Sequence, residues 1–363
     1  MSNQAKRQKA IIEKFYESFR DSFFDEPEAR HPEALKAFQK AEFGEDTLQQ
    51  LDEFNRWMYE ENSRNKRIYA FCEEQVVGQQ SAIGLELSVL GEKVPSAYAI
   101  DLRVRPEWKM KGLGVAMIGS IMKKYELLIG LGVSDEAFSM FSRQGWKDMG
   151  KLDYLIKPVS WRGLLTSKSG GLDRLKRLAA TAYCKLGDWL SRNSHRDFKL
   201  SPVDLLDENI DQLYQAYQKS HITYLRNAEE LSWRYQSFKF TGDYELYELS
   251  NNQGVTVALA VLHRIMQDNK QVVMISEIVS EEKYYPHLLC AIDRLLREKP
   301  ADVISYQGCD KEFVKALKKQ RYFERPYGSR FMFYTENEAL ASKLSDRNKW
   351  RVSSGDSDLE FHL

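Results

Sequence analysis

Two glycines stand where a strand-like run gives way to a helix-like one, within residues 108–118 (WKMKGLGVAMI). Their spacing is Lys109-x-x-Gly112-x-Gly114. The first N–H groups of a helix have no partner inside the helix and carry a partial positive charge, so they attract phosphate. Glycine has no side chain that would keep a phosphate away from them. The pattern predicts a pyrophosphate-binding turn, to which Lys109 and Lys111 add positive charge.

The same glycine pair has a second interpretation, because glycine at a helix start also lets neighbouring elements pack closely. A carboxylate lies nearby: Asp101 stands in the apolar run YAIDLRV that precedes the turn. An aspartate in such a strand can act as a general base toward an amine. It can equally bond to loop N–H groups or pair with Arg103 or Arg105. Glu86, on the preceding strand-like segment, is the second candidate for the base.

Length and composition favour a folded protein of more than one domain. The chain has 363 residues, of which 43% are hydrophobic and 12% aromatic, and 363 residues exceed one ordinary domain. Lys+Arg and Asp+Glu both number 53, so the net charge is zero. This balance gives no indication of a nucleic-acid partner.

Several sequence features favour a cytoplasmic location. The first residues are charged throughout and do not resemble a signal peptide. No window approaches the ~20 apolar residues that span a bilayer. The four cysteines are scattered, which is typical of reduced thiols. The six histidines show no ligand spacing, so we predict no metal site.

The expected elements of the first half alternate between helices and strands. Helical periodicity covers 5–23, 32–41 and 45–60, and strand-like runs cover 67–74, 79–90 and 95–104. After the glycine turn we expect a helix to about 125, a strand at 126–133, a helix at 134–144 and a strand at 151–158. This order is an antiparallel meander that continues into an α/β half.

The second half of the chain repeats landmarks of the first. Trp57-Met58-Tyr59 is matched by Trp233-Arg234-Tyr235, and the segment beginning at Gly132 is matched by the one beginning at Gly308. Both offsets are 176 residues (233 − 57 and 308 − 132). The repeat predicts a tandem duplication with domains at 1–160 and 201–363. The same offset places Leu288 and Cys290 opposite Gly112 and Gly114, so only the first copy keeps the glycine turn.

A basic segment, 161–200, separates the two copies. It holds nine Lys/Arg against three Asp, and its leucines recur at helical spacing. One interpretation is a linker helix that docks on a domain. The other is a basic amphipathic helix that contacts an anionic membrane surface.

Two motifs in the first copy resemble those of the GNAT superfamily of acyl-CoA-dependent N-acetyltransferases. The stretch VRPEWKMKGLGVAMI resembles motif A, a glycine turn that follows a Val-x-Pro turn. The stretch GVSDEAFSMFSRQGWKDMG resembles motif B, with Phe141, Gly145 and Trp146 at its signature positions. The match runs from about residue 53 to 158, and a fainter one from about 230 to 335. The resemblance implies an α/β (α+β) fold of two GNAT-like domains, each a mixed, mostly antiparallel sheet with splayed central strands between helices.

The resemblance also implies a cofactor site for acetyl-CoA between the splayed strands. Its pantetheine arm would meet Leu102–Val104, and its pyrophosphate would meet the turn. The implied cofactor-binding residues are Leu102, Arg103, Val104, Lys109, Met110, Lys111, Gly112, Leu113, Gly114, Val115, Phe138 and Phe141. The backbone N–H of Val104 would stabilise the oxyanion, and Trp57 and Tyr59 would line the acceptor pocket.

Two positions depart from the GNAT pattern. Motif A has Gln or Arg where this chain has Lys109, which keeps the charge without a planar group. Motif B usually has a tyrosine that protonates the leaving thiolate, and this chain has Phe141 there. The source of that proton is therefore open.

The leading hypothesis is an acetyl-CoA-dependent N-acetyltransferase that acts on a primary amine, with an amino sugar as acceptor by analogy with similar two-domain chains of bacterial surface-polysaccharide assembly. We expect one CoA per chain, a small-molecule acceptor and a second domain that shapes the acceptor site or a homodimer. One alternative is a FemABX-like aminoacyl transferase. Another is a non-catalytic scaffold that binds or senses CoA.

Overall fold

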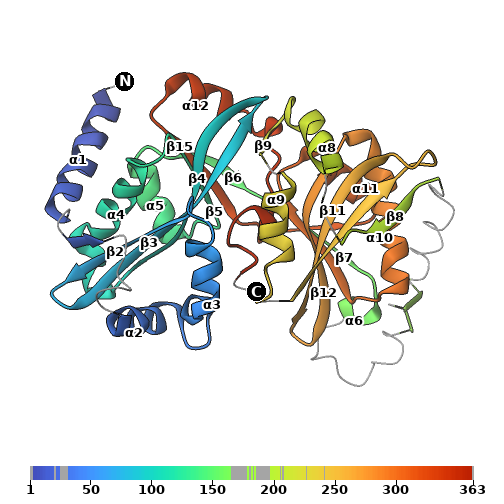
Figure 1. Ribbon diagram of the computed structural model, residues 1–363, viewed down its shortest axis with the longest axis horizontal. Helices are drawn as coiled ribbons and strands as arrows, with labels where there is room; N and C mark the ends of the chain where they lie inside the picture. The colour runs from blue at the N-terminus through green and yellow to red at the C-terminus, as the bar shows by residue number, and fades with distance from the viewer. Residues whose placement is uncertain are drawn as a thin grey trace. The chain divides into compact units, whose positions relative to one another are not determined.

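The computed structural model describes residues 3–19, 22–24, 32–164, 178–179, 181–182, 184, 197–204, 206, 208–225, 227–240 and 242–361. The chain folds into two compact units (Figure 1). The first unit comprises Met1–Lys151, Ser329–Arg347 and Ser357–His362. The second comprises Leu152–Gly328, Asn348–Asp356 and Leu363.

The first unit is built on one mixed sheet. Its strands lie in the order β1-β2-β3-β4-β5-β15-β6. Most neighbours are antiparallel, and β4 and β5 are parallel. The strand bounds are β1 Phe23–Phe24, β2 Lys66–Cys72, β3 Gln75–Val89, β4 Glu92–Val104, β5 Leu127–Leu131, β6 Lys147–Lys151 and β15 Arg330–Thr335.

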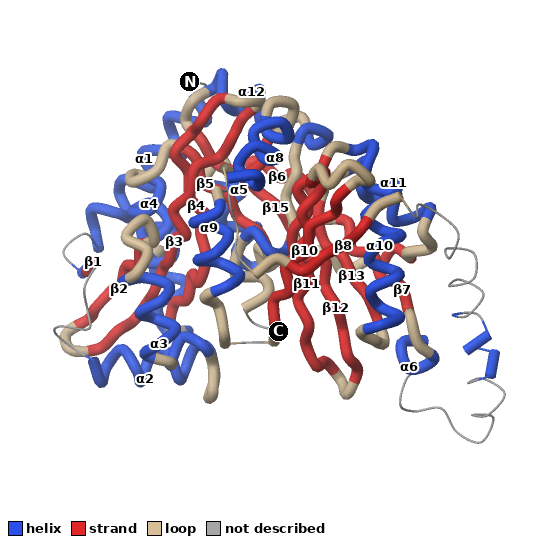
Figure 2. Tube along the Cα trace, turned by 45° about the vertical axis from the view of Figure 1, so that its right-hand side comes forward, coloured by secondary structure: helices blue, strands red, loops and turns tan. Residues whose placement is uncertain are grey.

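Helices cover both faces of the first sheet (Figure 2). On one face, α4 and α5 pack Ile118, Ile121 and Phe141 onto the apolar side chains of the strands. On the other face, α2 packs Leu35 and Phe38. The bounds are α1 Asn3–Phe19, α2 Pro32–Phe43, η2 Leu48–Gln50, α3 Asp52–Asn55, the π-helical turn η3 Arg56–Glu60, η4 Pro106–Lys111, α4 Leu113–Met122, α5 Asp135–Arg143 and α12 Glu338–Leu344.

The second unit repeats this architecture. Its sheet has the order β14-β7-β13-β12-β11-β10-β8, and α10 and α11 bury their apolar sides against it. The strands are β7 Asp153–Pro158, β8 Lys199–Pro202, β10 Asp243–Ser250, β11 Thr256–Gln267, β12 Lys270–Ser280, β13 Val303–Gly308 and β14 Phe323–Arg325, with β9 Ile222–Tyr224 nearby in sequence. The helices are α6 Trp161–Leu164, α8 Glu208–Gln218, α9 Ala228–Leu231, η5 Ser232–Gln236, η6 Glu282–Tyr284, α10 Tyr285–Glu298, α11 Lys311–Lys319, η7 Arg347–Lys349 and η8 Ser354–Asp356.

Each unit contains one strand from the other sequence repeat. The predicted domains, 1–160 and 201–363, are contiguous ranges and do not include this exchange. The strand β7 follows β6 after only Leu152, yet β7 pairs with β13 and β14 of the second sheet. Reciprocally, β15 lies between β5 and β6 of the first sheet. A tight hairpin needs about two residues to reverse the chain. Because one residue separates β6 from β7, the two strands do not form a tight hairpin, and they belong to different sheets.

The predicted amphipathic helix of the basic segment 161–200 lies mostly outside the described residues. Only α6, a few short stretches and the start of β8 are described there. Across the described parts of the chain, the structure contains no helix with both the length and the apolar character needed to cross a bilayer.

The strand exchange predicts where core truncations act. Leu155 of β7 is fully buried in the core of the second unit, and Met332 of β15 in that of the first. We expect Leu155→Ala and Met332→Ala each to cost about 2–5 kcal/mol in the free energy of unfolding. Hydrogen exchange should rise in β11–β13 for the first variant and in β4 and β5 for the second.

The exposed Met266 of β11 offers a control, since Met266→Ala should change the unfolding free energy by no more than about 0.5 kcal/mol. Faster exchange in the first sheet on Leu155→Ala, with the second sheet unaffected, would contradict the exchange of strands.

Candidate functional site

In the first unit the parallel strands β4 and β5 pair over only three residues. The pairs are Ser96 with Leu127, Ala97 with Leu128 and Tyr98 with Ile129. Beyond them β4 continues to Val104 without pairing to β5. The predicted splay of the central strands is confirmed, and one edge of β4 is left open over its last six residues.

A β-bulge shapes this open part of β4. Gln79 of β3 pairs with Arg103 and Ser81 pairs with Ile100, so Gln80 opposes both Asp101 and Leu102. Asp101 has a left-handed φ of 54°. Bulges of this kind often lie beside active sites, where they redirect a side chain. The candidate base therefore stands at the one irregular point of the strand.

The backbone N–H of Val104, the predicted oxyanion donor, points away from β3. The N–H of the next residue, Arg105, donates to the Val77 carbonyl of β3 at 3.0 Å. Backbone groups of successive residues in a strand point to opposite edges. The Val104 N–H therefore points away from β3, toward the side on which β5 has diverged.

The N-terminus of α4 lies at the end of β4 and carries no side-chain cap. By contrast, the Ser134 hydroxyl accepts from the Ala137 N–H and caps α5. A Cβ added at Gly114 would lie 3.4 Å from the Met140 sulfur and 3.8 Å from the Val104 side chain. The uncapped N–H groups of α4 thus begin between the end of β4 and α5, where the predicted pyrophosphate would bind.

Gly112 has a packing role in addition to its predicted one. Its φ of 85° is left-handed, and an added Cβ would lie 2.1 Å from the Phe15 ring of α1. Gly119, further along α4, is similarly covered by Ile12. The alternative interpretation of close packing therefore applies to Gly112, while Gly114 keeps only ordinary contacts.

The basic residues of the turn have protein partners. Lys109 forms an ion pair with Glu136 of α5 at 3.2 Å, and both side chains are substantially exposed. The Lys111 ammonium lies 4.3 Å from the centroid of the Trp108 ring. Met110 is 96% exposed. Exposed ion pairs contribute little to stability. A charged ligand can therefore replace Glu136 as the partner of Lys109 with little loss of folding free energy.

The aromatic residues of motif B belong to the core of the first unit. Phe141 stacks on Trp146 with a centroid distance of 4.5 Å and is buried. The Arg330 guanidinium lies 3.7 Å above the Phe138 ring. The position that usually holds a phenolic acid is thus filled by a packed phenyl ring.

Of the two predicted acceptor contacts, the structure brings Tyr59 to a cavity and buries Trp57. Trp57 packs against Phe54 and Phe361, with centroid distances of 5.7 Å to each. Tyr59 lines a cavity of about 740 Å³. Burial, with the negative charge of Asp101 as the next cause, raises the pKa of Tyr59 well above its ordinary value, so the phenol stays neutral. The charge of Asp101, at the bulge, thus acts on the phenol of Tyr59, which lines the cavity.

Glu86, the second candidate for the base, lies far from the bulge. It pairs in register with Pro95, whereas Val104 pairs with Gly78, eight residues along β3. At about 3.3 Å per residue this is ~26 Å. Its carboxylate is half exposed and lies 3.7 Å from the Lys93 ammonium, so Glu86 does not join the site. Among the residues that the structure describes, no three His, Cys, Asp or Glu side chains gather as metal ligands.

The second unit has the same divergence of strands, but a later segment occupies it. Pairing of β12 with β13 ends at Ile275 and Tyr306. The Ser353 hydroxyl donates to the Ser276 carbonyl of β12, and Ser353 bridges to Gly308 of β13. The Cys309 N–H donates to the Val352 carbonyl at 2.9 Å. We call residues 352–355 the plug segment.

A buried ion pair anchors the plug segment. The Arg351 guanidinium lies 2.9 Å from the Asp310 carboxylate, which also accepts the Tyr285 hydroxyl at 2.5 Å. Burial raises the pKa of Asp310, while Arg351 acts against that rise. Removing one partner of such a pair costs about 3–5 kcal/mol. In addition, the second residue of α10 is Pro286, which has no N–H to offer a phosphate.

Sequence reasoning missed the plug segment and the lining of the cavity. The plug segment has no periodicity of its own and pairs with strands some 45–77 residues away. Arg67 donates to Asn55, and its guanidinium lies 4.2 Å from the Tyr59 ring. The aromatic and polar residues at the end of the 45–60 helix were the only signal for these contacts.

Sequence comparisons find no match: no family model fits the chain, and no curated protein matches it. Solved structures do. A GCN5-related N-acetyltransferase from Anabaena variabilis aligns with a TM-score of 0.60 at 11% identity, over 87% of this chain and 72% of that one. An Enterococcus faecalis protein described as a probable N-acyltransferase aligns with a TM-score of 0.59 at 12% identity, over 86% and 72%.

N-myristoyltransferase from Saccharomyces cerevisiae, with bound myristoyl-CoA, aligns with a TM-score of 0.55 at 14% identity, over 86% of this chain and 82% of that one. At such low identity the likeness carries the fold alone. These alignments confirm the predicted fold class: the chain has a tandem, two-domain GNAT fold.

Proposed function

We propose that this chain is an acyl-CoA-dependent N-acyltransferase that transfers an acetyl group to a primary amine. The observation that carries the proposal is the open edge of β4 beside the uncapped N-terminus of α4. The open edge offers backbone hydrogen bonds to a pantetheine arm, and the helix start offers N–H groups to a pyrophosphate. Leu102–Val104 and Lys109–Val115 would hold acetyl-CoA there, next to Phe138 and Phe141.

The chemistry needs little from the protein beyond position, a base and an oxyanion donor. The amine attacks the thioester carbonyl, the Val104 N–H stabilises the oxyanion, and Asp101 accepts a proton from the amine. The tetrahedral intermediate then expels the CoA thiolate. Since Phe141 has no hydroxyl, the thiolate takes its proton from solvent.

An amino sugar is the acceptor class that we propose, by analogy with similar two-domain chains. The acyl group needs a direct test, because one structural relative carries myristoyl-CoA and another is described as an N-acetyltransferase. Thiol release with acetyl-CoA and myristoyl-CoA side by side distinguishes the two. Myristoyl transfer without acetyl transfer would replace the acetyl assignment.

Two other functions remain in competition. A scaffold that binds CoA without catalysis agrees with the phenyl ring of Phe141 in motif B, and it should release no thiol beyond hydrolysis. A FemABX-like aminoacyl transferase would use an aminoacyl-tRNA and should show no stabilisation by acyl-CoA. The cytoplasmic location, the homodimer and the membrane contact of 161–200 stay predictions.

Two glycines of α4 provide a matched pair of variants for the cofactor site. Gly114→Ala places a methyl group at the start of α4 with ordinary packing contacts, so the ligand-free melting temperature should stay or rise, while acetyl-CoA affinity falls about 10-fold. Gly119→Ala meets Ile12 at 2.7 Å and should lower the melting temperature while the shift induced by acetyl-CoA persists. Equal ligand-induced shifts in both variants would refute the cofactor site.

Asp101 can be tested against another aspartate of the same backbone conformation. Asp101 and Asp46 have φ values of 54° and 60°, and asparagine tolerates this region. We expect Asp101→Asn to lower kcat about 10²-fold, as loss of a general base does. Asp46→Asn should leave kcat unchanged. If kcat of Asp101→Asn is unchanged, a group other than Asp101 is the general base.

The plug segment predicts the stoichiometry of cofactor binding. Because residues 352–355 bond to β12 and β13 where a thioester would enter the second unit, calorimetric titration should give one acetyl-CoA per chain. Two equivalents per chain would show that the second unit opens.

A further inference from the structure

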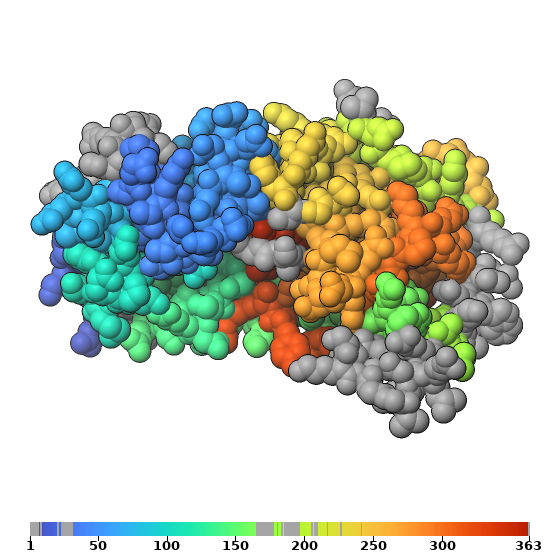
Figure 3. Space-filling model, turned by 90° about the horizontal axis from the view of Figure 1, so that it is seen from below, coloured from blue at the N-terminus to red at the C-terminus, as the bar shows by residue number. Residues whose placement is uncertain are grey.

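The cavity lined by Tyr59 lies within the first unit and is large enough for a polar substrate. Helix α2, the helical turns α3 and η3, and the start of β2 form its walls. Its volume of about 740 Å³ falls within the usual range of small-molecule sites. The residues of α2 and α3, blue in Figure 3, lie on the surface that faces the viewer.

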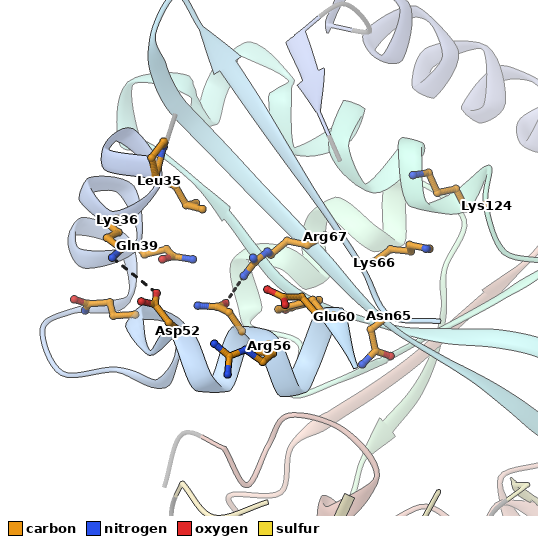
Figure 4. Close-up of a pocket in the computed structure, with 14 residues that line it drawn as sticks. Leu35, Lys36, Gln39, Asp52, Arg56, Glu60, Asn65, Lys66, Arg67 and Lys124 are labelled. Carbon is orange, nitrogen blue, oxygen red and sulfur yellow. Dashed lines mark hydrogen bonds and ion pairs between the residues drawn. The ribbon is translucent and has the colours of Figure 1, made fainter. Parts of the chain in front are cut away.

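The charge of this cavity is strongly positive although the chain is neutral. Five basic side chains line it, Lys36, Arg56, Lys66, Arg67 and Lys124, against the two carboxylates of Asp52 and Glu60. Lys36 and Asp52 form an ion pair at 3.8 Å near α2. The excess of positive charge therefore belongs to the other end, where Lys66, Arg67 and Lys124 lie in Figure 4.

Arg67 is held in a fixed position in this charged end. One guanidinium nitrogen donates to the Asn55 side-chain oxygen. The guanidinium carbon lies 4.2 Å from the Tyr59 ring centroid and 5.2 Å from that of Tyr69. A planar guanidinium fixed in this way binds phosphate or carboxylate with little further loss of entropy.

The strand register places this charged end at a defined distance from the proposed reaction centre. Arg67 pairs with Ser81, and Ser81 pairs with Ile100, the residue before Asp101. Two strand spacings amount to about 10 Å. The Tyr59 ring lies against the Arg67 guanidinium, and the charge of Asp101 also acts on its phenol. An amine at the bulge and an anion at Arg67 would thus be separated by roughly the length of a sugar phosphate.

We infer that this cavity binds the acceptor through an anionic group, so that the substrate class is an amine that also carries a phosphate or a carboxylate. The inference rests on the proposed acyl transfer and adds the chemical class of its acceptor. Lys66, Arg67 and Lys124 bind the anionic group, and the amine reaches Asp101.

Calorimetry on the full chain tests the site without turnover. Glucosamine 6-phosphate should bind at least 10-fold more tightly than glucosamine. Lys66→Gln and Lys124→Gln should each reduce that ratio by about 5- to 10-fold, whereas Lys93→Gln, whose lysine pairs with Glu86 outside the cavity, should not. Glucosamine and its phosphate binding with equal affinity would overturn the inference.

Thiol release with acetyl-CoA then compares glucosamine, glucosamine 6-phosphate and the carboxylate-bearing muramic acid. A higher kcat/KM for either anionic amine supports the inference, and the two arms show which anion is used. Equal kcat/KM for all three amines would contradict it while leaving the acyl transfer intact. Conversely, phosphate-dependent binding without thiol release would refute the transferase and retain an anion site.

Discussion

The end of pairing between β4 and β5 at Tyr98 and Ile129 is the constraint on which the rest of the structure depends. A strand that loses its neighbour exposes backbone N–H and C=O groups, and a buried group left without a partner costs about 1–3 kcal/mol. Something must satisfy those groups. The two units meet this requirement differently: the second bonds its plug segment to β12 and β13, and we propose that a thioester cofactor does so in the first.

The sequence differences between the repeats follow from this contrast. A turn that approaches a pyrophosphate needs glycine and an uncapped helix start, and the first unit has Gly112, Gly114 and no cap on α4. The corresponding helix of the second unit begins at Tyr285 with Pro286, and Leu288 and Cys290 are buried in its core. Once the plug segment occupies the divergence, α10 is free to pack as an ordinary amphipathic helix. We therefore expect the second unit to contribute structure rather than a second cofactor site.

The region around the proposed acceptor combines rigidity with charge. Arg67 is stacked on Tyr59 and bonded to Asn55, so one short π-helical turn and one strand fix both the guanidinium and the phenol. The π-helical turn is the last helical element before β2, and Tyr59 of this turn lines the cavity while Trp57 and Met58 are buried. Trp57 is thus a core residue, and Tyr59, two positions later, is a cavity residue.

The sequence by itself determined the repeat, the fold and the turn at Gly112 and Gly114, because periodicity and short motifs are local and survive in the printed order of residues. It could not determine which sheet receives β7 or β15, since a strand does not encode its partner. Nor could it show that Phe15 covers Gly112, that Glu86 stands ~26 Å from the end of β4, or that residues 352–355 fill the second divergence. Those facts depend on contacts between residues distant in sequence, which only the tertiary structure brings together.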